Sequence, residues 1–296
     1  MGSPEARPPT GTGRLNARAY PPGPNQLAAR YPPDPLLEHP DPQAHGSPGP
    51  AAGGPPPAEP DARPLGRPQR RHRWGLGAFV LAELMFLGVS ALVAPLVAGE
   101  NPSAVALGTA VAVPTVLAAT VALLITRLRG NGPKADLGLV WSWRDLEIGL
   151  AFGVAGLALT LVATAVFVAM AGPDVTSAVG DLFGGRRAEP AAAVLILLIV
   201  VLVAPVCEEI LYRGLLWGAL EKLGAGRWVA FGLVTVIFSL AHFEITRMPL
   251  LLVISIPLGL ARLYTGRLLA SIVAHQVNNL LPGIALYLML TGAVPV

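Results

Sequence analysis

Two adjacent glutamates and an arginine lie in a long apolar stretch of this sequence. Residues 191–206 are wholly apolar, and the helical pattern continues beyond them through Glu208 and Glu209. On a helix Glu209 and Arg213 are four residues apart and share a face, so they can form an ion pair. Glu208 is rotated from Glu209 by about 100° and has no such partner. The spacing favours one supported carboxylate and a second that is free to act as a general base. Two structural ion pairs are the alternative interpretation.

Three more polar groups occur in apolar segments further along the chain. His275 and Asn279 are four apart and share a helix face, and His242 follows Phe238 by four residues. At a rise of about 1.5 Å per residue, Glu208, His242 and Asn279 lie about 18–22 Å from the nearest charged flank, and His275 lies about 12 Å from it. Similar depths predict a shared polar cavity. The alternative interpretation of each histidine is a buried core residue with a purely structural role.

The apolar segments themselves have the length of membrane spans, because a bilayer core needs about 20 residues of helix. Seven segments qualify: 76–98, 103–126, 146–171, 191–206 with its helical continuation to 220, 228–243, 250–264 and 268–290. Glu83 is the only charge in the first segment and has no obvious partner. Pro282-Gly283 predicts a kink or break in the last. The predicted fold class is an all-α, polytopic transmembrane bundle of about seven spans.

Composition agrees with a membrane protein. The 296 residues are 53% hydrophobic and only 13% charged, about half the charged fraction of an ordinary soluble domain. The mean hydropathy is +0.59. Cys207 is the single cysteine, which excludes an internal disulfide and a cysteine-based zinc cluster. The net charge of +3 comes with basic residues at the edges of apolar runs, so we expect a lipid bilayer as partner and no nucleic acid.

The N-terminal part differs from the rest, because 19 of the 30 prolines lie in the first 70 residues. Such a segment cannot bury enough apolar surface to offset its ordering entropy. We predict a disordered, Pro-rich cytoplasmic tail over 1–73 and a transmembrane domain over 74–296.

The orientation follows from basic residues between the spans, since cytoplasmic loops are enriched in them. If the spans alternate, one side receives twelve arginines and lysines: Arg67, Arg70, Arg71, Arg73, Arg127, Arg129, Lys134, Arg144, Lys222, Arg227, Arg262 and Arg267. The other side receives Arg186, Arg187 and Arg247. The asymmetry predicts a multi-pass protein of the cell membrane with its N-terminus in the cytoplasm.

Together the polar positions resemble a known family. Glu208-Glu209-x-x-x-Arg213, Phe238-x-x-x-His242 and His275-x-x-x-Asn279 are similar in order and spacing to the three motifs of the CAAX prenyl protease 2 and bacteriocin-processing (CPBP, ABI-type) intramembrane proteases. The resemblance covers residues 190–282, and the stretch 136–139 before one span is also similar. It implies an intramembrane endopeptidase whose partner is a peptide or membrane-protein substrate.

Residue roles follow from that resemblance. It implies that Glu208 activates the attacking water, that His242 helps to hold and polarise it, and that His275 and Asn279 stabilise the oxyanion. It makes Glu209 and Arg213 a supporting ion pair. An oxyanion donor typically contributes about 3–4 kcal/mol to such a reaction.

Three alternatives remain open at the level of sequence. Zinc is a candidate cofactor with Glu208, His242 and His275 as ligands, although a glutamate-activated water needs no metal and the metal-free mechanism is favoured. A non-proteolytic membrane immunity or scaffold protein of the same fold would act by binding. A transporter is least favoured, because transporters often show repeated halves and no repeat is visible.

Overall fold

The computed structural model describes residues 2, 72–99, 102–172 and 177–294. The predicted tail therefore lies, apart from residues 2, 72 and 73, outside the described residues. All the helices below belong to one unit, Pro64–Val296.

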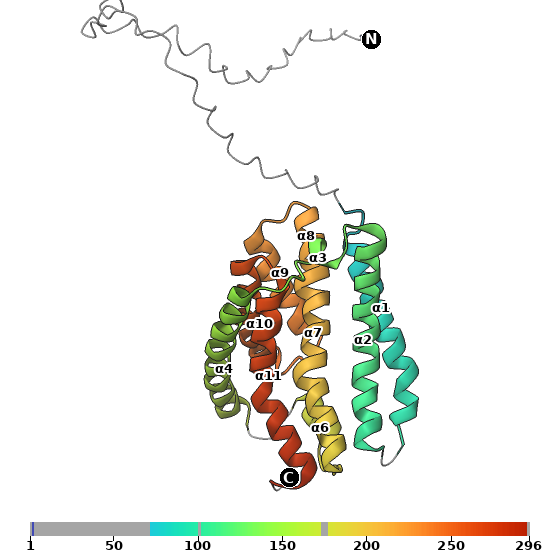
Figure 1. The fold of residues 1–296 in the computed structure, drawn as a ribbon, viewed down its shortest axis with the longest axis vertical. Coiled ribbons are helices and arrows are strands. Elements are labelled where there is room, and N and C mark those ends of the chain that lie inside the picture. The colour runs from blue at the N-terminus through green and yellow to red at the C-terminus, as the bar shows by residue number, and fades with distance from the viewer. Residues whose placement is uncertain (1, 3–71, 100–101, 173–176, 295–296) are drawn as a thin grey trace, which may run out of the picture. The chain divides into compact units, whose positions relative to one another are not determined.

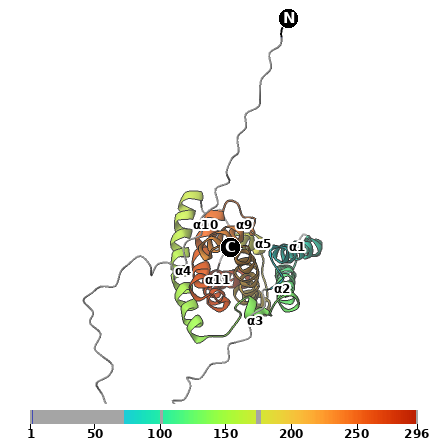
Figure 2. The ribbon, with the colours of Figure 1, turned by 90° about the horizontal axis from the view of Figure 1, so that it is seen from above.

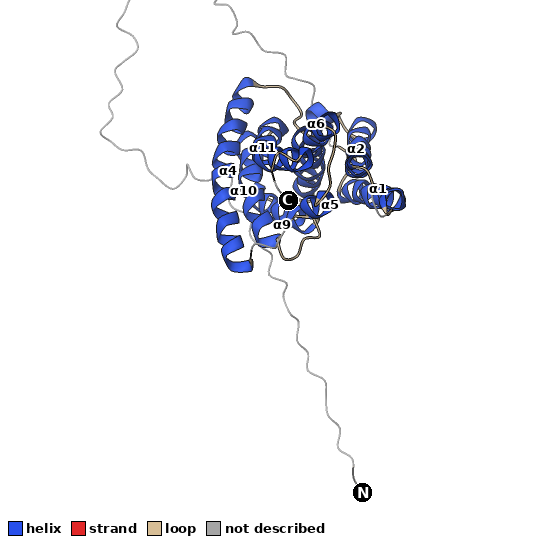
Figure 3. Cartoon of the chain, turned by 90° about the horizontal axis from the view of Figure 1, so that it is seen from below, coloured by secondary structure: helices blue, strands red, loops and turns tan. Residues whose placement is uncertain are grey.

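The described residues form helices and no strand, so the predicted all-α class is confirmed (Figure 1; Figure 3). The helices are α1 (Leu76–Val93), α2 (Ala104–Arg129), α3 (Pro133–Asp136), α4 (Trp143–Ala171), α5 (Ala178–Phe183), α6 (Pro190–Leu198), α7 (Ala204–Glu209), α8 (Trp217–Lys222), α9 (Arg227–Leu240), α10 (Met248–Thr265) and α11 (Leu268–Thr291). A 3-10 turn, Ala94–Val97, follows α1. Helices α6, α7 and α8 are parts of one continuous helix of 33 residues, Pro190–Lys222.

Five of these described helices are long and apolar enough to cross a membrane: α1, α2, α4, the continuous helix Pro190–Lys222, and α10. The sequence predicts seven spans, and the two others differ for separate reasons. Helix α9 has only 14 residues, about 21 Å of helix, which is short of a bilayer core of about 30 Å. Helix α11 has 24 residues, but the polar residues around His275 lower its hydropathy.

The helices that carry the polar motifs lie in the middle of the described bundle. Figure 2 shows α4 on one side of α9, α10 and α11, and the α1–α2 pair on the other. Helix α4 packs along α10 and α11, and α2 packs along the helix Pro190–Lys222. The central helices are therefore shielded from two sides.

Three glycines allow α4 to approach its neighbours closely. A Cβ at Gly149 would lie 2.7 Å from the carbonyl oxygen of Ala270, and one at Gly153 would lie 2.7 Å from Cβ of Val277. Gly156 faces Pro257 of α10 in the same way. Small residues at helix contacts are typical of membrane bundles, where van der Waals packing drives association.

Helix α11 runs without a break through Pro282, so the break considered for this segment is absent. Gly283 lies against the π-helical part of the neighbouring helix, where an added Cβ would be 2.5 Å from Val201. Helix α10 ends at Gly266 in the left-handed conformation, with φ 69°. The tight turn after it starts α11 at Leu268.

Candidate active site

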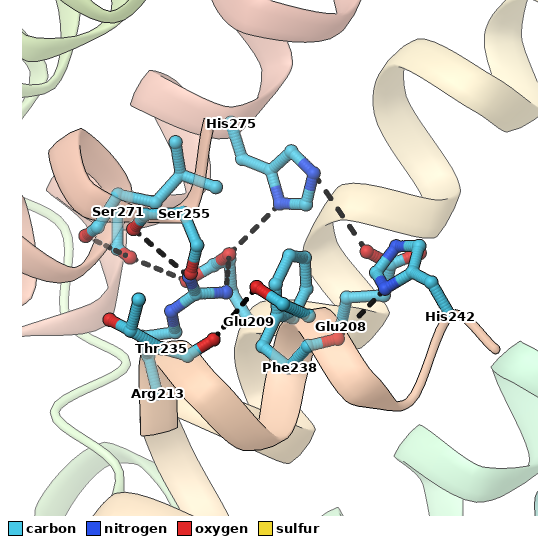
Figure 4. A network of polar contacts seen from close by, with 11 residues as sticks. Glu208, Glu209, Arg213, Thr235, Phe238, His242, Ser255, Ser271 and His275 are labelled. Atoms are coloured by element: carbon cyan, nitrogen blue, oxygen red, sulfur yellow. Dashed lines mark hydrogen bonds and ion pairs between the residues drawn. The ribbon is translucent and has the colours of Figure 1, made fainter. Parts of the chain in front are cut away.

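The predicted site residues come from three neighbouring parts of the bundle. Glu208 and Glu209 end α7, and Arg213 lies in the next turn of the same continuous helix. His242 follows the end of α9 by two residues, and His275 is buried in α11. Figure 4 shows these side chains gathered around Phe238.

Glu209 lies at the centre of a buried polar network. Its side chain is fully buried, and Nη1 of Arg213 donates to its Oε1 at 2.9 Å, as the four-residue spacing predicts. Nδ1 of His275 lies 2.9 Å from the same oxygen. The hydroxyl of Ser271 donates to Oε2. Both carboxylate oxygens therefore accept hydrogen bonds, which is what keeps a buried charge from being costly.

Arg213 is equally buried and is held by two further contacts. Its Nη2 donates to the hydroxyl of Ser255 on α10 at 2.6 Å. Its guanidinium lies over the ring of Phe238, 4.2 Å from the centroid. A buried ion pair depends on such additional contacts, because the desolvation of two charges can exceed their attraction.

Glu208 is in a different environment from its neighbour. Its side chain is 26% exposed, and Nε2 of His275 lies 3.8 Å from its Oε2. That separation is too long for a hydrogen bond. Among the described residues, no hydrogen bond holds this carboxylate. The acid without an ion-pair partner on its own helix is thus also the one that solvent can reach.

The orientation of His275 follows from its contact with Glu209. An ionised carboxylate can only accept, so Nδ1 of His275 carries the proton. Nε2 is then the nitrogen that faces Glu208, as Figure 4 shows. The buried network thereby fixes the imidazole with one defined nitrogen toward the exposed acid.

His242 is oriented in the same manner by its own helix. Its Nδ1 lies 2.8 Å from the carbonyl oxygen of Phe238. A carbonyl also only accepts, so Nδ1 donates and the neutral ring keeps its lone pair on Nε2. The ring of Phe238 packs against both imidazoles, with centroids 4.7 Å from His242 and 5.8 Å from His275. The two histidines therefore flank one aromatic ring.

Asn279 makes a contact that its sequence position does not predict. Its Nδ2 donates to the carbonyl oxygen of Val200 at 3.2 Å. Val200 lies in a π-helical turn, Ile199–Val203, in which Ala204 donates to Ile199. In that register the carbonyl of Val200 would pair with the nitrogen of Pro205, which has no hydrogen to give. One amide hydrogen of Asn279 supplies the missing bond and the other remains available.

A second π-helical turn, Ile210–Leu216, follows the two glutamates, so α7 lies between two of them. Such turns occur frequently at functional sites. The signal for the first is Pro205, whose ring and missing hydrogen disturb the α-helical register.

Glu208, His242 and His275 are the three candidate zinc ligands. Within the described residues, no three His, Cys, Asp or Glu side chains are placed to hold one ion. Nδ1 of both histidines is used in hydrogen bonds. No catalytic step is assigned to a metal.

Glu83 of α1 has a partner after all. The hydroxyl of Tyr212 donates a hydrogen bond to its carboxylate, and Glu83 also interacts electrostatically with Glu208. One oxygen, Oε1, is buried and has no hydrogen-bond partner.

Sequence reasoning missed Ser255, Ser271 and Tyr212, which all contact motif residues. Two of them could have been found by spacing. Ser271 precedes His275 by four residues and Tyr212 follows Glu208 by four, so each lies on the face of its neighbour. Ser255 gives no such signal, because its partner is on another helix.

The comparisons agree with the motif-based resemblance. Residues 190–281 match a family described as type II CAAX prenyl endopeptidase Rce1-like, which confirms the recognition of the CAAX protease family. The match begins with α6 and ends within α11, so it contains the glutamate pair, both histidines and Asn279. Searches of curated proteins and of solved structures found no significant match. The match supports the resemblance to CAAX-type proteases over residues 190–281, and the five candidate spans indicate a multi-pass membrane protein.

Proposed function

We propose that this chain, whose residues 190–281 carry the sequence of a CAAX-type protease family, is an intramembrane endopeptidase that uses Glu208 to activate water. The observation that carries the proposal is the unequal environment of the two adjacent acids. Glu209 is fully buried and has hydrogen bonds from Arg213, Ser271 and His275. Glu208 is partly exposed and faces His275 without a hydrogen bond.

The proposed reaction uses Glu208 first as a base and then as an acid. It takes one proton from water while the water oxygen attacks the carbonyl carbon of the peptide bond. Nε2 of His242 is free to accept a hydrogen bond from the same water. Glu208 then returns the proton to the leaving nitrogen as the carbon–nitrogen bond breaks. A positioned acid–base group of this kind typically contributes about 10²–10⁴-fold in rate.

The oxyanion is the second requirement of the reaction. His275 can donate to it from Nε2 when that nitrogen also carries a proton. Asn279 can donate with the amide hydrogen that Val200 does not use. We propose both as oxyanion donors, with Glu209 and Arg213 as the ion pair that supports His275.

The substrate is a peptide or membrane protein that reaches the partly exposed acid from the bilayer. Prenylated CAAX proteins are the class that the family's description names, and bacteriocin precursors are a further candidate class. We place the N-terminus in the cytoplasm, because the basic residues gather on that side of the predicted topology.

The test compares membranes of cells that produce the native protein with membranes that contain the Glu208→Gln variant. Mass spectrometry of peptides and protein termini is expected to show products that require the native protein. Glu147→Gln is the matched control, because Glu147 is an exposed glutamate at the start of α4, and it should behave like the native protein. Identical termini with and without the Glu208 carboxylate would contradict the proposal. A biological function that survives Glu208→Gln would favour the immunity or scaffold alternative.

A further inference from the structure

An acid from outside the family match faces the same site. Glu83 lies near the middle of α1, a helix with no other charged residue. A charge at this depth is costly and such residues usually have a function. Its helix precedes the matched segment 190–281, so the motif comparison assigns it no role.

The position of Glu83 is fixed by a residue that lies between two motif residues. Tyr212 lies between Glu209 and Arg213 in the sequence, and its hydroxyl donates to the Glu83 carboxylate. The Tyr212 ring packs edge-on against Phe238, with centroids 5.2 Å apart. The Glu83 side chain is therefore connected to the aromatic ring that both histidines contact.

The start of α1 is anchored to the helix that carries Glu208. Trp74 is buried, and its ring packs against Gly218, where an added Cβ would lie 2.7 Å from the ring. Nζ of Lys222 donates to the Trp74 carbonyl at 2.6 Å. The indole nitrogen of Trp74 donates to Asp136 at 2.9 Å. These contacts fix the start of α1 against α8, and α1 also packs against the π-helical turn Ile210–Leu216, which contains Tyr212.

Oε1 of Glu83 is buried and has no partner among the described residues. A buried polar atom without a partner is uncommon and indicates strain, a catalytic role or an unseen water. Phe79, one turn before Glu83, packs edge-on against Tyr212 with centroids 5.7 Å apart, and Glu208 lies one turn before Tyr212. The two acids therefore lie on helices that pack together, and Glu208 also has no hydrogen bond from the described residues. One water between them would give both carboxylates a donor, because a water molecule has two hydrogens to give.

We propose that Glu83 is a further catalytic residue: its Oε1 accepts one hydrogen of the attacking water while Glu208 accepts the other. This inference rests on the proposed protease function. Glu208 removes its hydrogen as a proton, and the water oxygen forms the bond to the carbonyl carbon. The electron pair of the carbonyl moves to its oxygen. Glu83 keeps its hydrogen bond to the hydroxyl that remains, and Glu208 then protonates the leaving nitrogen. The two carboxylates thus aim the lone pair of the water.

The kinetic test uses purified protein in proteoliposomes and a farnesylated peptide that ends in a CAAX sequence. Glu83→Leu removes the acceptor and should lower kcat by about 10²-fold, with KM within twofold, since it acts on the water and not on substrate binding. Glu83→Gln keeps an oxygen acceptor and should restore part of that loss. Tyr212→Phe should lower kcat by a smaller factor, because it frees the Glu83 side chain. Glu147→Leu is the matched control on α4.

A merely structural role for Glu83 predicts a different result. It would lower the melting temperature and the amount of folded protein. KM would change together with kcat, or neither would change, and glutamine would not rescue the loss. A kcat of Glu83→Leu within twofold of the native value would overturn the inference, while loss of cleavage in Glu208→Gln would leave the proposed function intact.

A second measurement does not depend on the substrate. A crystal structure in lipid at a resolution that shows ordered waters should contain one water within about 3.2 Å of both Glu83 and Glu208. The same site should be empty or displaced in Glu83→Leu. A native structure with ordered waters nearby but none between the two acids would overturn the inference, and this result decides the matter if the farnesylated peptide is not cleaved.

Discussion

Replacing Asn279 with leucine is expected to destabilise the protein as long as Pro205 is present in the neighbouring helix. Asn279 donates to the carbonyl of Val200, which lies in the π-helical turn Ile199–Val203. The nitrogen that would pair with this carbonyl belongs to Pro205 and has no hydrogen. Leucine has the same branching and the same number of side-chain heavy atoms as asparagine, so the substitution removes the donor and keeps the shape of the side chain.

The magnitude follows from the state in which Val200 is left. A buried acceptor that loses its partner costs about 1–3 kcal/mol. The contact is 3.2 Å long, at the long end of the usual range, so we expect about 1–2 kcal/mol. With Pro205→Ala in place, the amide of residue 205 can serve the π-register carbonyl, and the cost of Asn279→Leu should fall below about 0.5 kcal/mol.

Equilibrium unfolding in mixed detergent micelles, followed by circular dichroism, measures all four members of this double-mutant cycle. Gln276→Leu is the matched control, because Gln276 is an amide on the same helix with no hydrogen bond among the described residues. Its effect should be near zero. Strictly additive costs for Asn279→Leu and Pro205→Ala would refute the argument, since the two residues would then act independently.

Three further predictions concern packing, charge and metal. Gly149→Ala should destabilise the protein by about 1–3 kcal/mol through overpacking. Gly88→Ala, with no atom within 4 Å of the new Cβ, should be neutral or stabilise the protein by up to about 1 kcal/mol. Thermal unfolding of the two variants compares these effects. Arg213→Met should cost about 3–5 kcal/mol by leaving Glu209 buried without its cation, and adding Glu209→Leu should recover part of it. Cleavage should persist after exhaustive chelation in a peptide assay, and a loss that zinc alone restores would contradict the metal-free mechanism.

The fold was predictable where a single physical signal dominates. Hydropathy located all seven helical segments, because each apolar run is long and bounded by charge. The lengths of the helices were predicted less well. The segment predicted over 228–243 forms α9, which ends at Leu240, and the chain turns at Phe243, where φ is +56°. A non-glycine residue in the left-handed region is rare, and no sequence rule would have placed the turn there.

The candidate site was predictable only within each helix. Spacing of four residues gave the Glu209–Arg213 contact, because both ends of it lie on one helix. The hydrogen bond from Arg213 to Ser255 and that from Tyr212 to Glu83 join different helices. Their residues are separated in sequence by 42 and 129 positions, and only the packing of the bundle brings them together. Uncharged hydroxyls in an apolar segment also give no sign that they are used.

The two adjacent glutamates derive their different properties from helix geometry and not from side-chain chemistry. A rotation of about 100° per residue turns Glu209 toward α11, where Ser271 and His275 complete its hydrogen bonds. The same rotation leaves Glu208 at a partly exposed position. Because His275 gives its Nδ1 hydrogen to Glu209, its Nε2 must face Glu208. The buried ion pair therefore does more than hold helices together: it selects which nitrogen of His275 meets the acid that water can reach.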